Sequence, residues 1–252
     1  MFELERDVNG LLKLRKLKSQ LERATLESYL DTQWPTRTRK PDTTPVFRVR
    51  DVGECPRSIA LRLLGIPPPP PTPRSIRLMQ DGKDAELRIK AHYERSGHVS
   101  HNAVRLKRSF RLLGGAYDDR LNGDDSFVVV SGECDIILDM CTLVEIKRTG
   151  MENYKRWKRT EDLPQQMVDQ TTFYQKLYEC SEGLIHLSCR DTGDYRILSV
   201  DRDDDRVYYH LYNWLDLSKL ITQGKLPEPN HKELYCQYGD CLEYGAKHIK
   251  EE

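Results

Sequence analysis

The sequence lacks an excess of charge of either sign, since its 252 residues include 40 basic and 40 acidic side chains. The field of the whole molecule therefore gives no sign of a nucleic-acid partner, and any such affinity has to come from a local patch. The sequence also lacks an apolar run of about 18 residues, the length that a membrane-spanning helix requires. We expect a protein without a membrane span and with enough residues to bury a sizeable core.

Signals of secretion and of a disulfide framework are missing as well. The chain begins with Met1 and Phe2 followed by acids, where a signal peptide needs basic residues and then an apolar stretch. Its seven cysteines, an odd number, fit reduced thiols or metal ligands better than disulfide pairs. We expect a cytoplasmic protein, in the host cytoplasm if the source is a virus. Core thiols are expected at Cys134, Cys141, Cys180 and Cys189.

Helical and strand-like patterns share the chain, which predicts an α/β fold. Residues 1–45 are expected to form an amphipathic helix over 10–34 and a linker, and that helix either pairs between subunits or covers the protein's own core. Residues 46–252 form the main domain, in which the prolines at 67–71 make a rigid connector or a ligand for a proline-reading domain. The predicted helices cover 57–64, 75–96, 163–180 and 203–222, and the predicted strands cover 103–113, 126–131, 133–139, 142–148, 184–189 and 195–200.

A predicted β-hairpin over residues 133–148 carries three ionisable side chains, Asp135, Glu145 and Lys147. Strand residues alternate between faces, so Glu145 and Lys147 point the same way, Ile146 points into the core, and the partner strand brings Asp135 beside them. Two converging carboxylates repel unless a cation lies between them, and hard oxygen ligands suit Mg²⁺ or Mn²⁺. The alternative is an edge hairpin with a salt bridge, in which ionic groups would be costly neighbours of the core.

The order of these residues resembles the core of the PD-(D/E)XK nuclease superfamily. The motifs are Gly132 to Asp135, the triplet Glu145-Ile146-Lys147, Gly82 to Glu86 on the preceding helix, and Gln170 to Tyr174 on the following helix. A QxxxY helix in this place is similar to the RecB-like branch, which includes the iron-sulfur nucleases of CRISPR adaptation and many phage exonucleases. The resemblance covers residues 50–245. It implies a restriction-endonuclease-like central mixed sheet flanked by helices, with a helical N-terminal region and a cysteine-containing C-terminal tail.

The resemblance also implies roles for the charged residues. Asp135 and Glu145 would bind the metal directly, and the backbone carbonyl of Ile146 would complete the protein's ligands. Glu86, where many relatives carry His, would help to hold the ion. Lys147 would position or help to deprotonate the attacking water and stabilise the charged transition state.

The QxxxY helix supplies two further candidates. Gln170 and Tyr174 are four residues apart and therefore share a helix face. They are expected to reach the scissile phosphate or to orient Lys147. The alternative is a surface Gln and a packed Tyr.

Cations and aromatic residues alternate directly after the hairpin. Cations can contact phosphates, and rings can stack on unpaired bases. A solvated helix face would show the same composition. The candidate DNA-binding residues are Arg148, Tyr154, Lys155, Arg156, Trp157, Lys158 and Arg159.

The remaining cysteines resemble the set found in iron-sulfur members of the branch, in which one Cys precedes a Pro-Arg pair and three lie near the C-terminus. This chain has Cys55 before Pro-Arg but only Cys236 and Cys241 in its tail. Three thiolates with His231 or His248 suit an iron-sulfur cluster or, equally, Zn²⁺. A third alternative is that the thiols are simply packed.

Together these features predict a metal-dependent deoxyribonuclease, an exonuclease that acts on single-stranded or duplex DNA ends in recombination, repair or CRISPR spacer acquisition. No P-loop motif occurs, so unwinding would need a helicase partner. An annealing protein, a CRISPR-adaptation protein or further copies in an oligomer are other expected partners. The alternative function is a non-catalytic DNA-binding or adaptor protein that retains the nuclease fold.

Overall fold

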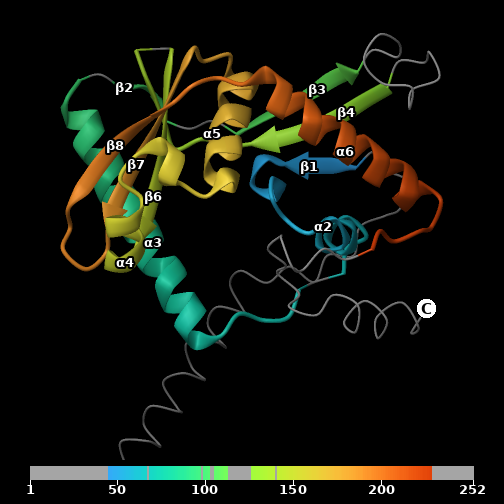
Figure 1. Ribbon diagram of the computed structural model, residues 1–252, viewed down its shortest axis with the longest axis horizontal. Helices are drawn as coiled ribbons and strands as arrows, with labels where there is room; N and C mark the ends of the chain where they lie inside the picture. Colours follow the sequence, from blue (N-terminus) through green and yellow to red (C-terminus); the bar gives the residue numbers. More distant parts are fainter. Residues whose placement is uncertain are drawn as a thin grey trace, which may run out of the picture. The chain divides into compact units, whose positions relative to one another are not determined.

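A computed structural model describes residues 45–66, 68–97, 99–102, 105–112, 126–139 and 141–228 (Figure 1). The predicted helix at 10–34, the linker and the tail with Cys236 and Cys241 lie outside the described residues. The structure forms two compact units, of which one contains residues 69–84 and the other contains the remaining described residues. Helix α3 (Pro73–Arg95) begins in the first unit and ends in the second.

The second unit is a mixed α/β structure with two mixed sheets, as expected from the sequence. A three-stranded sheet has the order β1-β4-β3, and its strands are β1 (Val46–Arg48), β3 (Leu106–Leu112) and β4 (Ser126–Gly132). A five-stranded sheet has the order β2-β5-β6-β7-β8, with β2 (Val99–Asn102), β5 (Ile136–Leu138), β6 (Thr142–Thr149), β7 (Glu182–Cys189) and β8 (Tyr195–Val200). The parallel pairs are β1 with β4 and β6 with β7, and the other neighbours are antiparallel.

Four more helices belong to this unit (Figure 1). They are α2 (Pro56–Leu63), α4 (Met151–Arg156), α5 (Gln165–Tyr178) and α6 (Asp204–Thr222), with short 3-10 turns at Val49–Asp51 and Thr160–Asp162. Helix α5 contacts β6 and β7 as well as α6, and α6 lies against β4 and α2. Of the described helices, none combines the length and apolar character that crossing a membrane requires.

Aromatic rings join strand β1 to helices α5 and α6. Phe47 of β1 stacks on Trp214 of α6 with ring centroids 5.1 Å apart, and Trp214 lies 5.1 Å from the ring of Phe173 on α5. All three side chains are almost completely buried. Burial of each large apolar side chain contributes about 1.5–3 kcal/mol to the free energy of unfolding. The stack therefore fixes the position of α5, and other residues of this helix reach the hairpin.

The predicted elements from 57 to 222 are confirmed to within a few residues. The sequence did not indicate β1, β2 or α4, because elements of three to six residues are too short to show a period. The prediction that Cys141 is a core thiol is wrong: it is exposed on the turn between β5 and β6, whereas Cys134, Cys180 and Cys189 are buried.

Gly132, at the end of β4, is a point of close approach between the hairpin and α5. A Cβ atom there would lie 2.7 Å from Val49 Cγ2, 2.8 Å from Tyr174 Cε1 and 3.0 Å from Leu177 Cδ2. Real Cβ atoms essentially never show the two shorter separations, so glycine is what lets β4 lie this close to Tyr174.

We expect Gly132→Ala to lower the free energy of unfolding by about 1–3 kcal/mol, because the methyl group overpacks a closed site. Urea denaturation followed by circular dichroism measures the change. Gly82→Ala is the matched control, since Gly82 is inside α3 and a Cβ there meets no atom of the described residues within 4 Å. That variant should be as stable as wild type or more stable by up to about 1 kcal/mol. Equal stabilities for the two variants would contradict the close approach.

Asp169 of α5 ties that helix to α6. Its carboxylate accepts hydrogen bonds from Arg206 Nε at 3.1 Å and Nη2 at 2.6 Å, from His210 Nε2 at 2.9 Å and from Gln165 Nε2 at 2.8 Å. The side chain is 5% exposed. Burial alone would raise the pKa of Asp169, but the hydrogen bonds from His210, Arg206 and Gln165 outweigh it and lower the pKa to about 2.

We expect Asp169→Asn to lower the free energy of unfolding by about 2–4 kcal/mol near neutral pH, because the amide leaves Arg206 without its carboxylate. The folded pKa lies below the unfolded value of about 3.9, so the stabilisation is present above about pH 4 and is lost as the pH falls towards about 2. The difference between wild type and variant should therefore shrink in acid. Denaturation curves at about pH 7 and about pH 3 test this, with the exposed Asp201→Asn as the control. A difference that does not change with pH would contradict the assignment.

Candidate active site

The strand β6 presents Glu145 and Lys147 on one face, as the sequence predicted. Lys147 Nζ donates to Glu145 Oε1 at 2.7 Å and to Gln170 Oε1 of α5 at 3.3 Å. Gln170 in turn donates from Nε2 to the carbonyl of Arg50 at 3.4 Å. The lysine therefore lies between the strand and the QxxxY helix, with a fixed position for its ammonium group.

Asp135 lies immediately before β5, and the antiparallel register of β5 and β6 brings it next to Glu145. Ile136 is opposite Val144 in that register. The carboxylate of Asp135 accepts a hydrogen bond from the backbone N–H of Ile146 at 2.7 Å. The hairpin thus places the two carboxylates and the lysine together.

Glu86 and Lys90 of α3 add a charged pair that the sequence analysis missed in part. Lys90 Nζ donates to Glu86 Oε1 at 2.5 Å and lies 3.6 Å from Asp135 Oδ1. The sequence signal for Lys90 is its spacing of four residues from Glu86, which puts both on one helix face. The ammonium of Lys90 is therefore the group that links Glu86 to Asp135.

The electrostatics of the site reflect this concentration of acids. Burial, followed by the charges of Glu145 and Glu86, raises the pKa of Asp135 well above its usual range. Burial disfavours the charged form of Lys147, but the adjacent Glu145 outweighs this effect and raises the pKa of Lys147. A positive charge is thus stabilised at the lysine, while the carboxylates repel one another.

Two of the predicted ligands, Glu145 and Asp135, offer oxygen atoms of the kind that a hard divalent cation binds. Glu145 is 7% exposed, and its Oε2 is buried without a hydrogen-bond partner among the described residues. An unpartnered carboxylate oxygen beside a second carboxylate is the kind of donor that Mg²⁺ or Mn²⁺ binds. Within the described ranges, no group of three or more His, Cys, Asp or Glu side chains is arranged to hold a metal. The carboxylate of Glu86 pairs with Lys90. In the described residues, Glu86 therefore does not join Asp135 and Glu145 in a set of three metal ligands.

The expectation that Ile146 points into the core is wrong, because its side chain is only partly buried. Ile146 pairs with His186 of β7, and the face of the sheet that they share turns towards a cavity rather than a closed core. The backbone of Ile146, which donates to Asp135, remains part of the hairpin site.

The QxxxY helix contributes a further tyrosine, Tyr178, that sequence reasoning missed. Gln170 and Tyr174 are 9% and 8% exposed, and Tyr178 follows them on the same face. The hydroxyl of Tyr178 donates to the carbonyl of Gly132 at 3.3 Å and accepts from the N–H of Cys134 at 3.3 Å. Tyr178 therefore holds the turn that positions Asp135.

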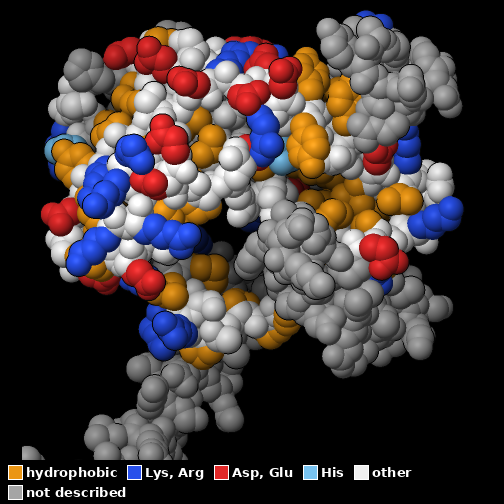
Figure 2. Space-filling model, viewed as in Figure 1, with side chains coloured by type: hydrophobic (Ala, Val, Ile, Leu, Met, Phe, Trp, Pro, Cys, Tyr) orange, Lys and Arg blue, Asp and Glu red, His pale blue; other side chains and the backbone are white. Residues whose placement is uncertain are grey.

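The basic segment after β6 separates into exposed cations and buried rings. Lys155, Arg156, Lys158 and Arg159 are exposed, and Figure 2 shows Lys and Arg side chains gathered on the face over α4 and the adjoining strands. The prediction that the rings of Tyr154 and Trp157 stack on bases does not fit their positions, since they are 6% and 9% exposed. They pack in a cluster with β7 and β8, because the segment folds back over that edge of the sheet.

Cys55 lies at the N-terminal end of α2 and is completely buried as a free thiol. Its proposed partners Cys236, Cys241, His231 and His248 lie outside the described residues. The neighbouring Arg57 donates from Nη1 to the carbonyl of Pro227 at 3.2 Å. The segment that leads into the tail is therefore in contact with the Cys-Pro-Arg element.

Comparison with known proteins gives few likenesses. No protein-family model and no curated protein matches the chain. Among solved structures, the crystal structure of SSO0001 is 15% identical with a TM-score of 0.46, and the match covers 85% of this chain and 89% of that one.

An alkaline exonuclease, LHK-Exo from Laribacter hongkongensis, is 14% identical with a TM-score of 0.37 over 69% of this chain and 75% of its own. LHK-Exo in complex with dAMP is 13% identical with a TM-score of 0.38 over 81% and 97%.

Proposed function

We propose that this protein is a metal-dependent deoxyribonuclease of the RecB-like type in the PD-(D/E)XK superfamily. The observation that carries the proposal is the contact of Lys147 with both Glu145 and Gln170, on a hairpin that also holds Asp135. These are the residue types that the ordered motifs assign to phosphodiester hydrolysis, and they meet although they come from three separate segments. A plain surface salt bridge would not require a buried glutamine from another helix.

In this proposal Asp135, Glu145 and the carbonyl of Ile146 hold Mg²⁺ or Mn²⁺, with Glu86 near them. The ion, when bound, lowers the pKa of a water molecule and offsets charge on the phosphoryl oxygens. Lys147 donates its N–H groups to the attacking water or to a phosphoryl oxygen, as it now donates to Glu145. Gln170 orients that ammonium group, and Tyr174 closes the site on the side of α5.

The substrate is proposed to be a DNA end, single-stranded or duplex. The exposed cations Lys155, Arg156, Lys158 and Arg159, together with Arg148, can contact successive phosphates close to the end of β6. Digestion from ends would serve recombination, repair or spacer acquisition, with a helicase, annealing or CRISPR-adaptation protein to present the end.

The tail cysteines are proposed to form a metal site with Cys55. The contact between Arg57 and Pro227 supports this proposal, because it brings the start of the tail to the element that contains Cys55. An iron-sulfur cluster or Zn²⁺ held by Cys55, Cys236 and Cys241, with His231 or His248, would join the two ends of the domain.

We expect Lys147→Ala and Glu145→Gln to reduce DNA digestion by about 100-fold or more, because the first removes a donor to the developing charge of the phosphate and the second removes a proposed ligand of the metal ion. End-labelled single-stranded and duplex DNA incubated with Mg²⁺ or Mn²⁺ measures the rate, and EDTA should abolish it. Lys225→Ala and Glu228→Gln, both exposed on the segment that follows α6, are the matched controls and should digest DNA as wild type does. Wild-type rates for the hairpin variants would disprove the site, whereas DNA binding without digestion would favour the adaptor function.

We expect purified full-length protein to contain stoichiometric iron with visible absorption, or stoichiometric zinc without colour, and Cys55→Ser to lose that metal. Elemental analysis of protein prepared without oxygen measures both metals. Cys141→Ser is the control, because Cys141 is an exposed free thiol. A wild-type protein without either metal would show that the thiols are only packed.

A further inference from the structure

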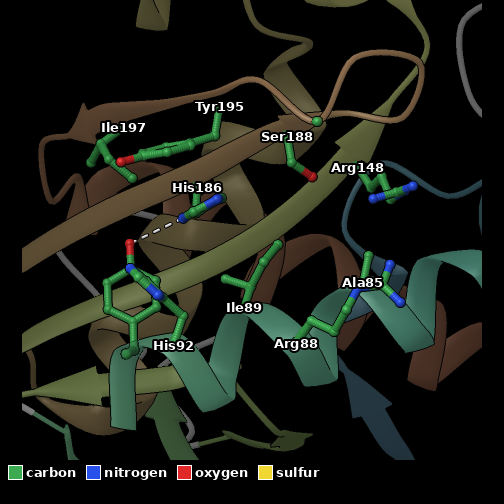
Figure 3. Close-up of a pocket in the computed structure, with 11 residues that line it drawn as sticks. Ala85, Arg88, Ile89, His92, Arg148, His186, Ser188, Tyr195 and Ile197 are labelled. Carbon is green, nitrogen blue, oxygen red and sulfur yellow. Dashed lines mark hydrogen bonds between the residues drawn. The ribbon is translucent and has the colours of Figure 1, made fainter. Parts of the chain in front are cut away.

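The cavity beside Ile146 and His186 lies on the face of the sheet opposite Glu145 and Lys147. It has a volume of about 600 Å³, is open to solvent, and is lined by residues of the second half of α3, of β6, β7 and β8 and of the turn at Gly193 (Figure 3). Its lining residues are Ala85, Arg88, Ile89, His92, Tyr93, Arg148, His186, Ser188, Gly193, Tyr195 and Ile197. The catalytic proposal above uses none of them apart from Arg148.

The described lining residues carry positive charge on two arginines and include no acid. Two arginines and two histidines are among the eleven residues, and neither aspartate nor glutamate is. Figure 3 shows the guanidinium groups of Arg88 and Arg148 towards one end of the cavity, and His186, Tyr195 and Ile197 towards the other. Arg88 comes from the helix and Arg148 from β6, so an anion at that end would meet a cation from each wall.

The other end presents an ordered set of rings. Tyr195 stacks on His186 with centroids 4.9 Å apart and an angle of 17° between the ring planes. Tyr93 lies edge-on to the same histidine at 5.7 Å, and its hydroxyl is 3.1 Å from His186 Nδ1. The histidine is thus held in place from two sides.

Tyr195 is 62% exposed, although one side of its ring faces His186. An aromatic ring fixed in orientation and open to solvent is a stacking surface that needs little further ordering to bind a flat ligand. Burial, followed by the nearby His92, lowers the pKa of His186, which favours a neutral ring beneath the tyrosine.

We propose that this cavity binds one unpaired nucleotide, with its base stacked on Tyr195 and its phosphate between Arg88 and Arg148. A nucleotide is the ligand class that combines a flat ring with an anion, and paired bases would not expose a ring face to Tyr195. The choice of a deoxynucleotide rests on the proposed nuclease function. The nucleotide is either free or part of a single strand, and the same chemistry recognises both.

Binding without cleavage tests the proposal. Full-length Lys147→Ala protein in EDTA is titrated in a calorimeter with thymidine 5′-monophosphate and with a 5′-phosphorylated oligothymidylate of about ten nucleotides. Two half-ligands serve as controls: thymidine, which lacks the phosphate, and inorganic phosphate, which lacks the base. We expect both phosphorylated nucleotides to bind, and each half-ligand to bind at least about ten-fold more weakly. Tighter binding of the oligonucleotide would identify a strand as the source, and equal binding would identify the free nucleotide.

Arg88→Ala and Tyr195→Ala, introduced into the same protein, should each weaken nucleotide binding by about ten-fold. The matched controls are Arg95→Ala, an exposed arginine further along α3, and Tyr209→Ala, a tyrosine that is 57% exposed on α6. Binding that is unchanged in Arg88→Ala and Tyr195→Ala, or inorganic phosphate that binds as well as the nucleotide, would overturn the proposal. Because no divalent ion and no catalytic lysine is present, this result is independent of whether the hairpin cleaves DNA.

Discussion

The ammonium group of Lys147 is held by contacts that involve three parts of the fold. These contacts link the three parts to one another. The group meets a carboxylate of its own strand and an amide of α5, and that amide reaches back to the carbonyl of Arg50. An exposed lysine keeps its ammonium group in water, because burial of a charge without partners has a large cost in free energy. Here the partners are supplied, so the strand, the helix and the segment after β1 have to keep their mutual positions for the charge to remain satisfied.

The packing around α5 explains how these positions are kept. Phe173 anchors the helix in the aromatic stack with Phe47 and Trp214, and Asp169 ties it to α6. The same helix turns Gln170 and Tyr178 towards the hairpin, where they contact Lys147 and the turn before Asp135. Because one helix carries both the structural and the site-facing residues, the stability of the core and the geometry of the site are not independent.

The sequence predicted the parts of this arrangement that follow from local pattern. Alternation along β6 places Glu145 and Lys147 together, and a spacing of four along α5 places Gln170 beside Tyr174, so both could be inferred without coordinates. The burial of Tyr154 and Trp157 could not, because it depends on how the segment folds back over β7 and β8. The stack of Tyr195 on His186 likewise results from the register of β7 and β8, in which the two rings are diagonal neighbours.

Helix α3 carries residues of both sites on adjacent stripes of its surface. Glu86 and Lys90 lie towards Asp135, while Arg88, Ile89 and His92 line the cavity across the sheet. An α-helix moves as a nearly rigid rod, so a slide along its axis or a turn about it displaces both stripes together. The charge pair beside the hairpin and the wall of the cavity are thus mechanically coupled, and whatever restrains one restrains the other.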